Sequence, residues 1–271
     1  MKHKIGIVQG RLLKSPKNRL QYFPVNIYEK EFAIAKEIGF DFIEFFSQRK
    51  FSKKNPIWSE NGINHYKKLC QENDLQVLNF CDDYIISNDL RKLKTIDYLI
   101  NLLHNCSKLK IKNLILPMYG KSNLSESNYL SYVKAFNTIS KDAKLKKINI
   151  LVESNISVEF FKSLKKIIHN KNIFFLYDTG NRLSPQPDYL KEIIKFSSEI
   201  RHIHIKDKNF SKKNVILGEG NVDFNKIFNL LKKIKYKGNF TLETNKGKDP
   251  INVAKKNMYF VEKLIKKIKF Q

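Results

Sequence analysis

The sequence contains few cysteines and no long apolar run, and each shortage excludes a class of protein. Its 271 residues include three cysteines, Cys70, Cys81 and Cys106, an odd number without a close pair. Such a set indicates neither a disulfide framework nor a thiolate zinc site, so we expect buried, reduced thiols. No segment approaches the roughly 18 uninterrupted apolar residues of a membrane helix. The start of the chain also lacks the longer apolar core of a secretion signal, so we expect a cytoplasmic protein without a membrane partner.

Acidic residues are scarce as well, since 26 Asp and Glu stand against 51 Lys and Arg, which gives a formal net charge of +25. A basic surface attracts phosphate backbones, which raises the question of nucleic-acid binding. Only six of the basic residues are arginine, and the lysines are spread over segments with helical patterns, as in Lys162, Lys165 and Lys166. This distribution favours solvated helix faces, and we predict no specific nucleic-acid partner.

Short β-rich runs alternate with longer amphipathic stretches from one end of the chain to the other. This alternation is typical of βαβ units with a parallel sheet. The eight predicted strands are residues 4–8, 40–46, 76–80, 113–118, 149–153, 173–177, 200–205 and 240–243. Predicted helices include residues 28–38, 90–109, 129–145 and 224–234, and a helical pattern follows Asp249. Because no linker divides the chain, we predict an α/β protein with one domain, residues 1–271, folded as a single (β/α)8 TIM barrel.

An open, doubly wound sheet is the alternative architecture. Its dinucleotide-binding fingerprint has three glycines in the turn after the first strand. Here Gly218 and Gly220 follow the seventh predicted strand, and no third glycine completes the motif. The pair indicates either a turn that requires a positive φ or a weak ligand contact.

Four polar residues stand at or near the ends of consecutive apolar runs in the second half of the chain. They are Glu153, Asp178, His204 and Glu243, in the fifth to eighth predicted strands. In a parallel barrel catalytic groups lie at the C-terminal ends of strands, so these side chains could converge. Three carboxylates and one imidazole favour Mn²⁺, Mg²⁺ or Co²⁺, and Zn²⁺ is also compatible. A bound cation would compensate the mutual repulsion of the carboxylates.

Several segments carry a more specific signal. They are GFDFIE at 39–44, LVE at 151–153, YDTGN at 177–181, HIHIKD at 202–207, LGEGNVDF at 217–224 and LE at 242–243. Together they resemble the xylose isomerase-like barrel superfamily, in its sugar phosphate isomerase/epimerase and ketose 3-epimerase branches. The resemblance implies one divalent metal held by Glu153, Asp178, His204 and Glu243. It also implies that the two glutamates are the catalytic acid/base pair, which moves a proton through an enediolate of a small sugar or sugar phosphate.

Two residues near His204 are candidates for substrate contact. His202 and Lys206 share its strand parity, so both could face the pocket. The alternatives are a core histidine hydrogen-bonded below the metal, and a lysine that pairs with Asp207 or is simply exposed.

Other candidate substrate contacts lie elsewhere in the chain. Glu44, taken to end the second strand, resembles a superfamily residue beside the pocket. Asn181 stands three residues after Asp178, where ketose 3-epimerases and endonuclease IV typically carry histidine, and this departure puts both close assignments in doubt. In the long first loop, Arg11 or Arg19 would suit a phosphate-bearing substrate, because guanidinium binds phosphate through two parallel hydrogen bonds. Surface packing is the alternative for this loop.

Other functions remain open at this stage. A lyase resembling inosose dehydratase or dehydroshikimate dehydratase would use the same four ligands. An endonuclease IV-like abasic-site endonuclease needs a three-zinc cluster with additional histidines, whereas His3, His65, His104 and His169 lie at strand starts or within helical patterns. A non-catalytic basic interaction module would show no metal dependence. We predict a sugar isomerase or epimerase, with assembly into a homo-oligomer left open.

Overall fold

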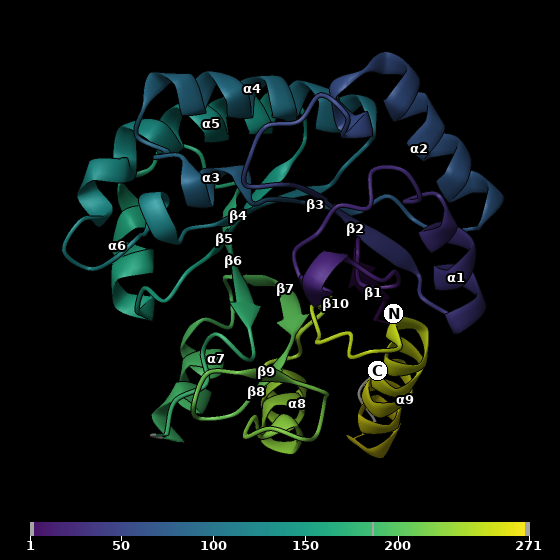
Figure 1. Cartoon of the computed structure of the whole chain (residues 1–271). Coiled ribbons are helices and arrows are strands. Elements are labelled where there is room, and N and C mark those ends of the chain that lie inside the picture. The colour runs from purple at the N-terminus through teal and green to yellow at the C-terminus, as the bar shows by residue number, and fades with distance from the viewer. Residues whose placement is uncertain (1–2, 186, 269–271) are drawn as a thin grey trace. The chain divides into compact units, whose positions relative to one another are not determined.

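The computed structural model describes residues 3–185 and 187–268. The eight long strands follow the order β1-β10-β7-β6-β5-β4-β3-β2 of a closed barrel, with helices between successive strands along the chain. The predicted (β/α)8 TIM barrel fold is therefore confirmed. The chain divides into two compact units, Met1–Ile43 with Leu176–Gln271 and Glu44–Phe175, and each is described by itself (Figure 1). That residues 1–271 form one domain stays a prediction.

The barrel strands agree closely with the predicted set. They are β1 (Ile5–Val8), β2 (Phe42–Ser47), β3 (Asn79–Asp82), β4 (Asn113–Pro117), β5 (Asn149–Glu153), β6 (Ile173–Asp178), β7 (Ile200–Ile205) and β10 (Asn239–Leu242). The α-helices are α1 (Lys30–Ile38), α2 (Glu60–Glu72), α3 (Tyr84–Ser87), α4 (Leu93–Lys108), α5 (Val133–Leu145), α6 (Val158–Ile167), α7 (Lys191–Lys195), α8 (Phe224–Lys233) and α9 (Pro250–Ile268). The 3-10 turns are η1 (Pro16–Asn18), η2 (Pro56–Trp58), η3 (Gly120–Ser122), η4 (Tyr129–Tyr132) and η5 (Pro187–Leu190). A hairpin of β8 (Asp207–Lys208) and β9 (Asn214–Val215) was not predicted.

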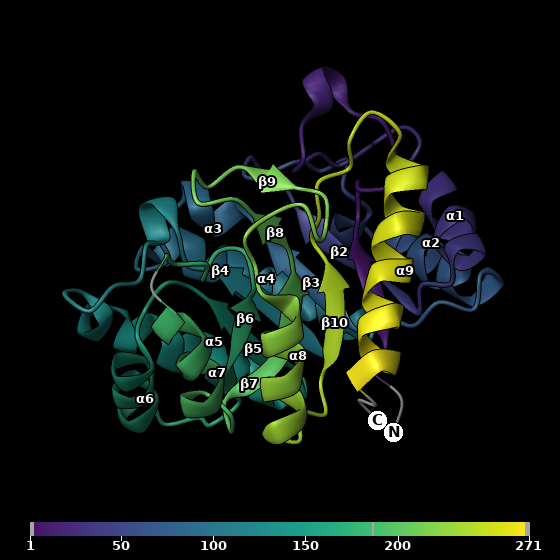
Figure 2. The ribbon, with the colours of Figure 1, turned by 90° about the horizontal axis from the view of Figure 1, so that it is seen from below.

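In the first unit, β10 lies between β1 and β7. Its parallel register pairs Phe240 with Ile5 on one side and with Ile203 on the other, and all three side chains are buried. Helix α9 contacts both α1 and α8 and lies between them (Figure 2). Gly39 ends α1 at a φ of 97°, a left-handed conformation that glycine adopts without steric cost.

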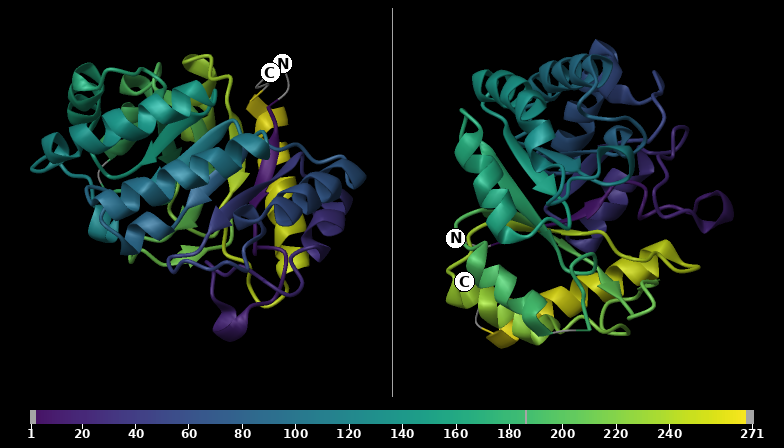
Figure 3. Two further views of the ribbon diagram at one scale, coloured as in Figure 1. Left: turned by 90° about the horizontal axis from the view of Figure 1, so that it is seen from above. Right: turned by 90° about the vertical axis from the view of Figure 1, so that its left-hand side faces the viewer.

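In the second unit, β2, β3, β4, β5 and the start of β6 pair in parallel in that order. Helices α4 and α5 pack against each other and are the neighbouring teal helices in the left view of Figure 3. The three cysteines are free and buried in this unit, as expected. Among the described residues, no helix is both long and apolar enough to cross a membrane.

The third strand is where the predicted boundaries were wrong. The prediction placed it at 76–80, but β3 begins at Asn79 and continues to Asp82. Its neighbour β2 likewise continues to Ser47, and the register pairs Ser47 with Asp82. The Ser47 hydroxyl donates a hydrogen bond to the Asp82 carboxylate. A strand boundary predicted from a run of apolar residues stops at the first polar residue. Here the pairing between β2 and β3 continues through the buried polar residues Ser47 and Asp82.

A buried carboxylate anchors the loop that follows β1. Glu31 is 1% exposed, and its two carboxylate oxygens accept hydrogen bonds from Gly10 N at 2.8 and 2.9 Å. Leu12 N donates to the same carboxylate at 3.2 Å. Lys246 Nζ donates to the Gly10 and Leu13 carbonyl oxygens, both at 3.3 Å. Burial raises the pKa of Glu31 to about 7, although the two peptide N–H groups and the Lys246 charge oppose this shift.

We therefore expect Glu31→Gln to change how stability depends on pH. Because the pKa of Glu31 rises from 4.5 to about 7 on folding, the folded protein holds this proton more tightly than the unfolded chain. Ionising Glu31 therefore costs the wild type stability as pH rises from about 4.5 to about 7, and the cost is constant above that range. Measured by urea unfolding, the free energy of unfolding of the wild type should fall relative to the variant by roughly 3 kcal/mol across this window. Glu37→Gln, at an exposed side chain that pairs with Lys255, is the matched control. A wild-type-to-variant difference that stays constant with pH would contradict the assignment.

Candidate metal centre

Three of the four predicted ligands belong to the first unit and lie close together there. Asp178 is the last residue of β6, His204 lies in β7, and Glu243 directly follows β10. His204 Nδ1 is 3.1 Å from Glu243 Oε2 and 4.0 Å from Asp178 Oδ2. The convergence arises because β7 and β10 are paired in parallel register, which brings the C-terminal ends of neighbouring strands to the same edge.

The turn after β6 orients Asp178. Its Oδ1 accepts hydrogen bonds from Gly180 N at 2.8 Å and Asn181 N at 2.7 Å. Among the described residues, its buried Oδ2 has no partner with hydrogen-bond geometry, although Lys206 Nζ lies 2.8 Å away as an ion-pair partner. A Cβ at position 180 would come within 2.9 Å of Lys206 Cγ, so glycine allows the lysine stem to cross this turn. Asp178 therefore keeps one carboxylate oxygen for a cation.

A buried lysine lies between two of these carboxylates. Lys206 Nζ is 2.8 Å from Asp178 Oδ2 and 2.7 Å from Glu243 Oε2. Its backbone is held by Thr179, whose hydroxyl accepts from Lys206 N at 2.9 Å and donates to Lys206 O at 2.7 Å. The alternative of simple exposure is wrong, because Lys206 is 6% exposed and forms ion pairs with Asp178 and Glu243.

The Glu243 carboxylate is surrounded by positive charge and hydrogen-bond donors. Its Oε1 is 3.5 Å from Arg11 Nη2 and accepts from Gln21 Nε2 at 3.3 Å. Arg11 Nη2 also donates to Gln21 Oε1 at 2.8 Å. Burial acts to raise the pKa of Glu243, but Lys206, His204 and Arg11 together hold it well below its ordinary value. Glu243 is therefore ionised at neutral pH, as a metal ligand or a general base must be.

The fourth predicted ligand, Glu153, belongs to the second unit. It is the last residue of β5 and is 4% exposed. The Tyr119 hydroxyl donates to its Oε1 at 3.2 Å, and Met118 N donates to its carbonyl oxygen at 2.8 Å. Glu153 thus stands at the expected end of its strand, with a tyrosine contact that the sequence analysis did not foresee, since Tyr119 lies just beyond the predicted strand 113–118.

His202 and Asn181 have well-defined partners in the first unit. His202 is 1% exposed, and its Nε2 is hydrogen-bonded to Thr241 Oγ1 at 2.7 Å. This cross-strand bond matches the core-histidine alternative. The Asn181 side-chain oxygen accepts from Lys208 Nζ at 2.6 Å. Substrate contacts by His202, Asn181, Lys206 and Arg11 stay predictions.

Glu44 does not end its strand, as the sequence analysis had assumed. Strand β2 continues for three residues to Ser47, so Glu44 lies within it and is fully buried. Its Oε2 accepts from Asn79 Nδ2 at 3.1 Å. Side-chain amides continue this chain of hydrogen bonds, from Asn113 to Asn79 at 2.9 Å and from Asn149 to Asn113 at 3.1 Å. Glu44 therefore belongs to a polar row that crosses the strands of the second unit, and its substrate contact stays a prediction.

The glycine pair after β7 forms a turn, as one of the two alternatives stated. Gly218 has a φ of 88°, and Gly218 N and Gly220 N donate to Asp207 Oδ2 at 2.9 and 3.0 Å. A Cβ at position 220 would overlap the Asp207 carboxylate. These glycines allow the backbone to wrap around a buried carboxylate.

The sequence analysis missed a further strand-end carboxylate. Asp82 ends β3 and is fully buried, and it accepts hydrogen bonds from the hydroxyls of Ser47 and, at 3.0 Å, Tyr98. Burial raises the pKa of Asp82 to about 6, against the effect of these hydrogen bonds. It was missed because the predicted strand ended at Phe80, although Asp82 and Asp83 follow directly after Phe80-Cys81.

The first-unit residues fit a divalent cation. One ligand atom from each of Asp178, His204 and Glu243 lies within 4.8 Å of the others. Asp178 Oδ2 lacks a hydrogen bond, and both carboxylates already attract one cationic group, Lys206. Two carboxylates and one imidazole are ligands that Mn²⁺, Mg²⁺, Co²⁺ and Zn²⁺ all accept in proteins.

Comparison with known proteins agrees with this fold. Residues 32–264 match the family model described as xylose isomerase-like TIM barrel, and the chain belongs to this family. The structure of an L-ribulose 3-epimerase matches with a TM-score of 0.79 at 17% identity, covering 99% of this chain and 96% of that one. A xylose isomerase-like TIM barrel protein from Mycobacterium smegmatis, solved in complex with magnesium, matches with a TM-score of 0.74 at 14% identity, covering 98% and 97%. At such identities the likeness shows the fold.

Several curated relatives are inosose dehydratases. An inosose dehydratase from Clostridium tetani (strain Massachusetts / E88) is 22% identical over 168 residues, which are 52% of this chain and 56% of the dehydratase. The chain spans about half the length of the curated relatives it matches.

Replacing Lys206 should strengthen metal binding. The Lys206 ammonium and a divalent ion would compete for the same oxygens of Asp178 and Glu243, so Lys206→Met removes the competitor while keeping an unbranched apolar stem. We expect the affinity of chelator-treated protein for Mn²⁺, measured by isothermal titration calorimetry, to rise on the order of tenfold. Lys226→Met, at an exposed lysine on α8, should leave the affinity unchanged. An affinity that falls in Lys206→Met would show that the lysine supports the ion rather than competing with it.

Proposed function

We propose that this protein is a divalent-metal-dependent isomerase or epimerase that acts on a small sugar or sugar phosphate. The observation that carries the proposal is the convergence of Asp178, His204 and Glu243 at strand ends of a xylose isomerase-like barrel. The similarity to an L-ribulose 3-epimerase supports the reaction type. We also propose that the enzyme is cytoplasmic, and we leave open whether it assembles into a homo-oligomer.

The proposed ligands of the single ion are Asp178, His204, Glu243 and Glu153. Glu153 joins the set because it ends β5, the strand that precedes β6 in the barrel order. Mn²⁺, Mg²⁺ or Co²⁺ is favoured, Zn²⁺ is compatible, and the magnesium complex of a protein with this fold supports a hard cation. When bound, the ion supplies Lewis-acid assistance to a substrate carbonyl and stabilises the negative charge that develops during proton abstraction.

The protein's own groups would move the proton. Glu243 is held ionised by Lys206, His204 and Arg11, so it can accept a proton from a substrate carbon. Glu153, oriented by the Tyr119 hydroxyl, is the partner that donates to the opposite face in an epimerisation. Lys206 would turn from the carboxylates to a substrate hydroxyl or phosphate once the ion compensates their charge.

Dehydration is the second candidate, favoured by the similarity to inosose dehydratases. It begins with the same abstraction of a carbon-bound proton but then expels a hydroxyl β to that carbon. Mass spectrometry of products from a panel of ketoses, ketose phosphates and inososes separates the two, because a dehydratase product has lost one water and an epimerase product has the substrate's mass.

Metal removal should abolish the reaction. We expect treatment with a chelator to eliminate turnover, and Mn²⁺, Mg²⁺ or Co²⁺ to restore it. His204→Ala should retain its fold by circular dichroism but lose the Mn²⁺-dependent rise in thermal midpoint, because it lacks one ligand. Turnover that resists the chelator, in protein that contains no metal by elemental analysis, would eliminate the proposal.

Proton transfer should be visible as solvent exchange. Turnover in D₂O should place deuterium at the reacting carbon, and Glu153→Gln or Glu243→Gln should each suppress this exchange on the order of 10²-fold, as expected for loss of an acid/base group. Each variant must first be shown to retain its ion. A metal-loaded Glu153→Gln protein with normal exchange would show that the two-glutamate mechanism is wrong even if the metal site is right.

A further inference from the structure

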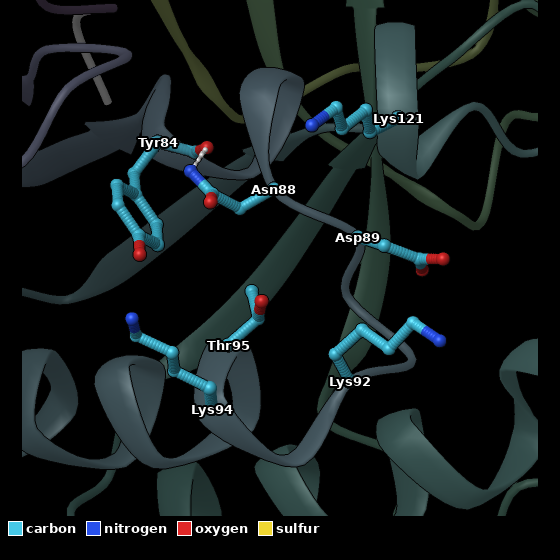
Figure 4. A pocket seen from close by; sticks show the side chains of 7 residues that line it. All are labelled: Tyr84, Asn88, Asp89, Lys92, Lys94, Thr95 and Lys121. Carbon is cyan, nitrogen blue, oxygen red and sulfur yellow. Dashed lines mark hydrogen bonds between the residues drawn. The ribbon is translucent and has the colours of Figure 1, made fainter.

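A cavity of about 410 Å³ lies within the second unit, and none of its lining residues belongs to the proposed metal centre. The lining comes from α3, the α3–α4 connection, the first turn of α4 and η3 (Figure 4). Helix α4 has 16 residues and begins at Leu93, so its amino end opens on this space.

The amino end of α4 is not capped by a side chain. Lys92 holds the N-cap position with an extended backbone, at φ −82° and ψ 135°, and makes no side-chain cap hydrogen bond. Lysine has no acceptor atom, so it cannot bind the first peptide N–H groups of the helix. The first turn also contains no acidic residue to interact with the positive end of the helix dipole. The helix end therefore attracts an external anion.

The side chains around the cavity carry mostly positive charge, like the amino end of α4. Lys92, Lys94 and Lys121 all line it. The single carboxylate among the lining residues, Asp89, already accepts from Arg91 Nε at 2.9 Å and Arg91 Nη2 at 2.8 Å. Three lysine charges thus remain after Asp89 is paired with Arg91.

The hydroxyl of a largely buried residue points into the cavity. Thr95, in the first turn of α4, is 4% exposed as a whole residue. Among the described residues its hydroxyl has no hydrogen-bond partner, and in Figure 4 the oxygen is directed into the space that the lining side chains surround. The hydroxyl oxygen is open to the cavity and is therefore available to exchange a hydrogen bond with a polar ligand there.

The walls of the cavity are tied together before any ligand arrives. Ser122 Oγ accepts from Leu90 N at 2.8 Å and donates to Asn88 O at 2.7 Å, which joins η3 to the α3–α4 connection. Asn88 Nδ2 donates to Tyr84 O at 2.9 Å (Figure 4). A site held in this way loses little conformational freedom on binding.

We propose that this cavity binds a phosphate group, either of a sugar phosphate or as inorganic phosphate. A phosphate has several acceptor oxygens and about two negative charges, which match the free helix end, the lysine ammonium groups and the Thr95 hydroxyl. The proposal does not depend on the proposed function, because it concerns binding rather than turnover.

The test is isothermal titration calorimetry of the full chain with inorganic phosphate at physiological ionic strength. We expect saturable binding at one site. Thr95→Val removes the hydroxyl but keeps shape and charge, and should weaken binding about tenfold, as expected for a lost hydrogen bond to a charged group. Lys94→Met with Lys121→Met should weaken it by a similar factor or more. Lys141→Met, at an exposed lysine on α5, should have no effect.

Titrations with D-fructose 6-phosphate and D-fructose distinguish the two sources of phosphate. If the sugar phosphate binds more tightly than inorganic phosphate and Thr95→Val weakens both, the site takes the phosphate of a sugar phosphate. Equal affinities for the two phosphates, with the same loss in Thr95→Val, assign a site for inorganic phosphate. The proposal is overturned if the wild type shows no saturable phosphate binding below about 10 mM. It is also overturned if Thr95→Val and the double lysine variant bind as the wild type does.

Discussion

The contact of the Lys206 ammonium with Asp178 and Glu243 is the interaction on which the candidate centre depends. The two carboxylates, at the ends of β6 and β10, could not both stay ionised in a buried place without compensating positive charge. Lys206 supplies it at 2.8 and 2.7 Å, and the glycine at position 180 allows its stem to cross. A divalent ion would take over the same compensation, which frees the ammonium for a substrate. The centre is thus suited to bind a divalent ion.

Two other buried carboxylates are also stabilised by nearby hydrogen-bond donors or positive charge. Glu31 is surrounded by peptide N–H groups and faces the Lys246 charge, and Asp207 accepts from the turn formed by Gly218 and Gly220. In both cases a carboxylate holds a loop at the C-terminal side of a strand. The loops that carry Arg11 and the glycine pair are therefore positioned by buried electrostatics rather than by apolar packing alone. Such positioning suits a site whose geometry must be held closely.

The amino end of α4 shows the opposite arrangement, because its first turn contains no acidic residue to balance the positive end of the helix dipole. The contrast with α8 is direct, because Asp223 caps α8 by accepting from Lys226 N at 3.0 Å. Helix α4 places Lys92 at the equivalent position. A ligand can supply the missing anion at α4 because Lys92, Lys94, Lys121 and the Thr95 hydroxyl line the same cavity.

Much of the fold and of the candidate centre follows from the sequence alone. Strand and helix alternation, read from apolar periodicity, determined the eight strands and their order along the chain, because both patterns are local. The strand-end positions of Glu153, Asp178, His204 and Glu243 followed from the same reading. Tertiary structure alone decided the partners: Lys206 with Asp178 and Glu243, His202 with Thr241, and Glu44 with Asn79 inside β2. It also decided that Asp82 ends β3, because the parallel register with β2 continues to the pair of Ser47 and Asp82. These contacts join residues from different strands, and their distances depend on register and side-chain direction, which no local pattern of residues specifies.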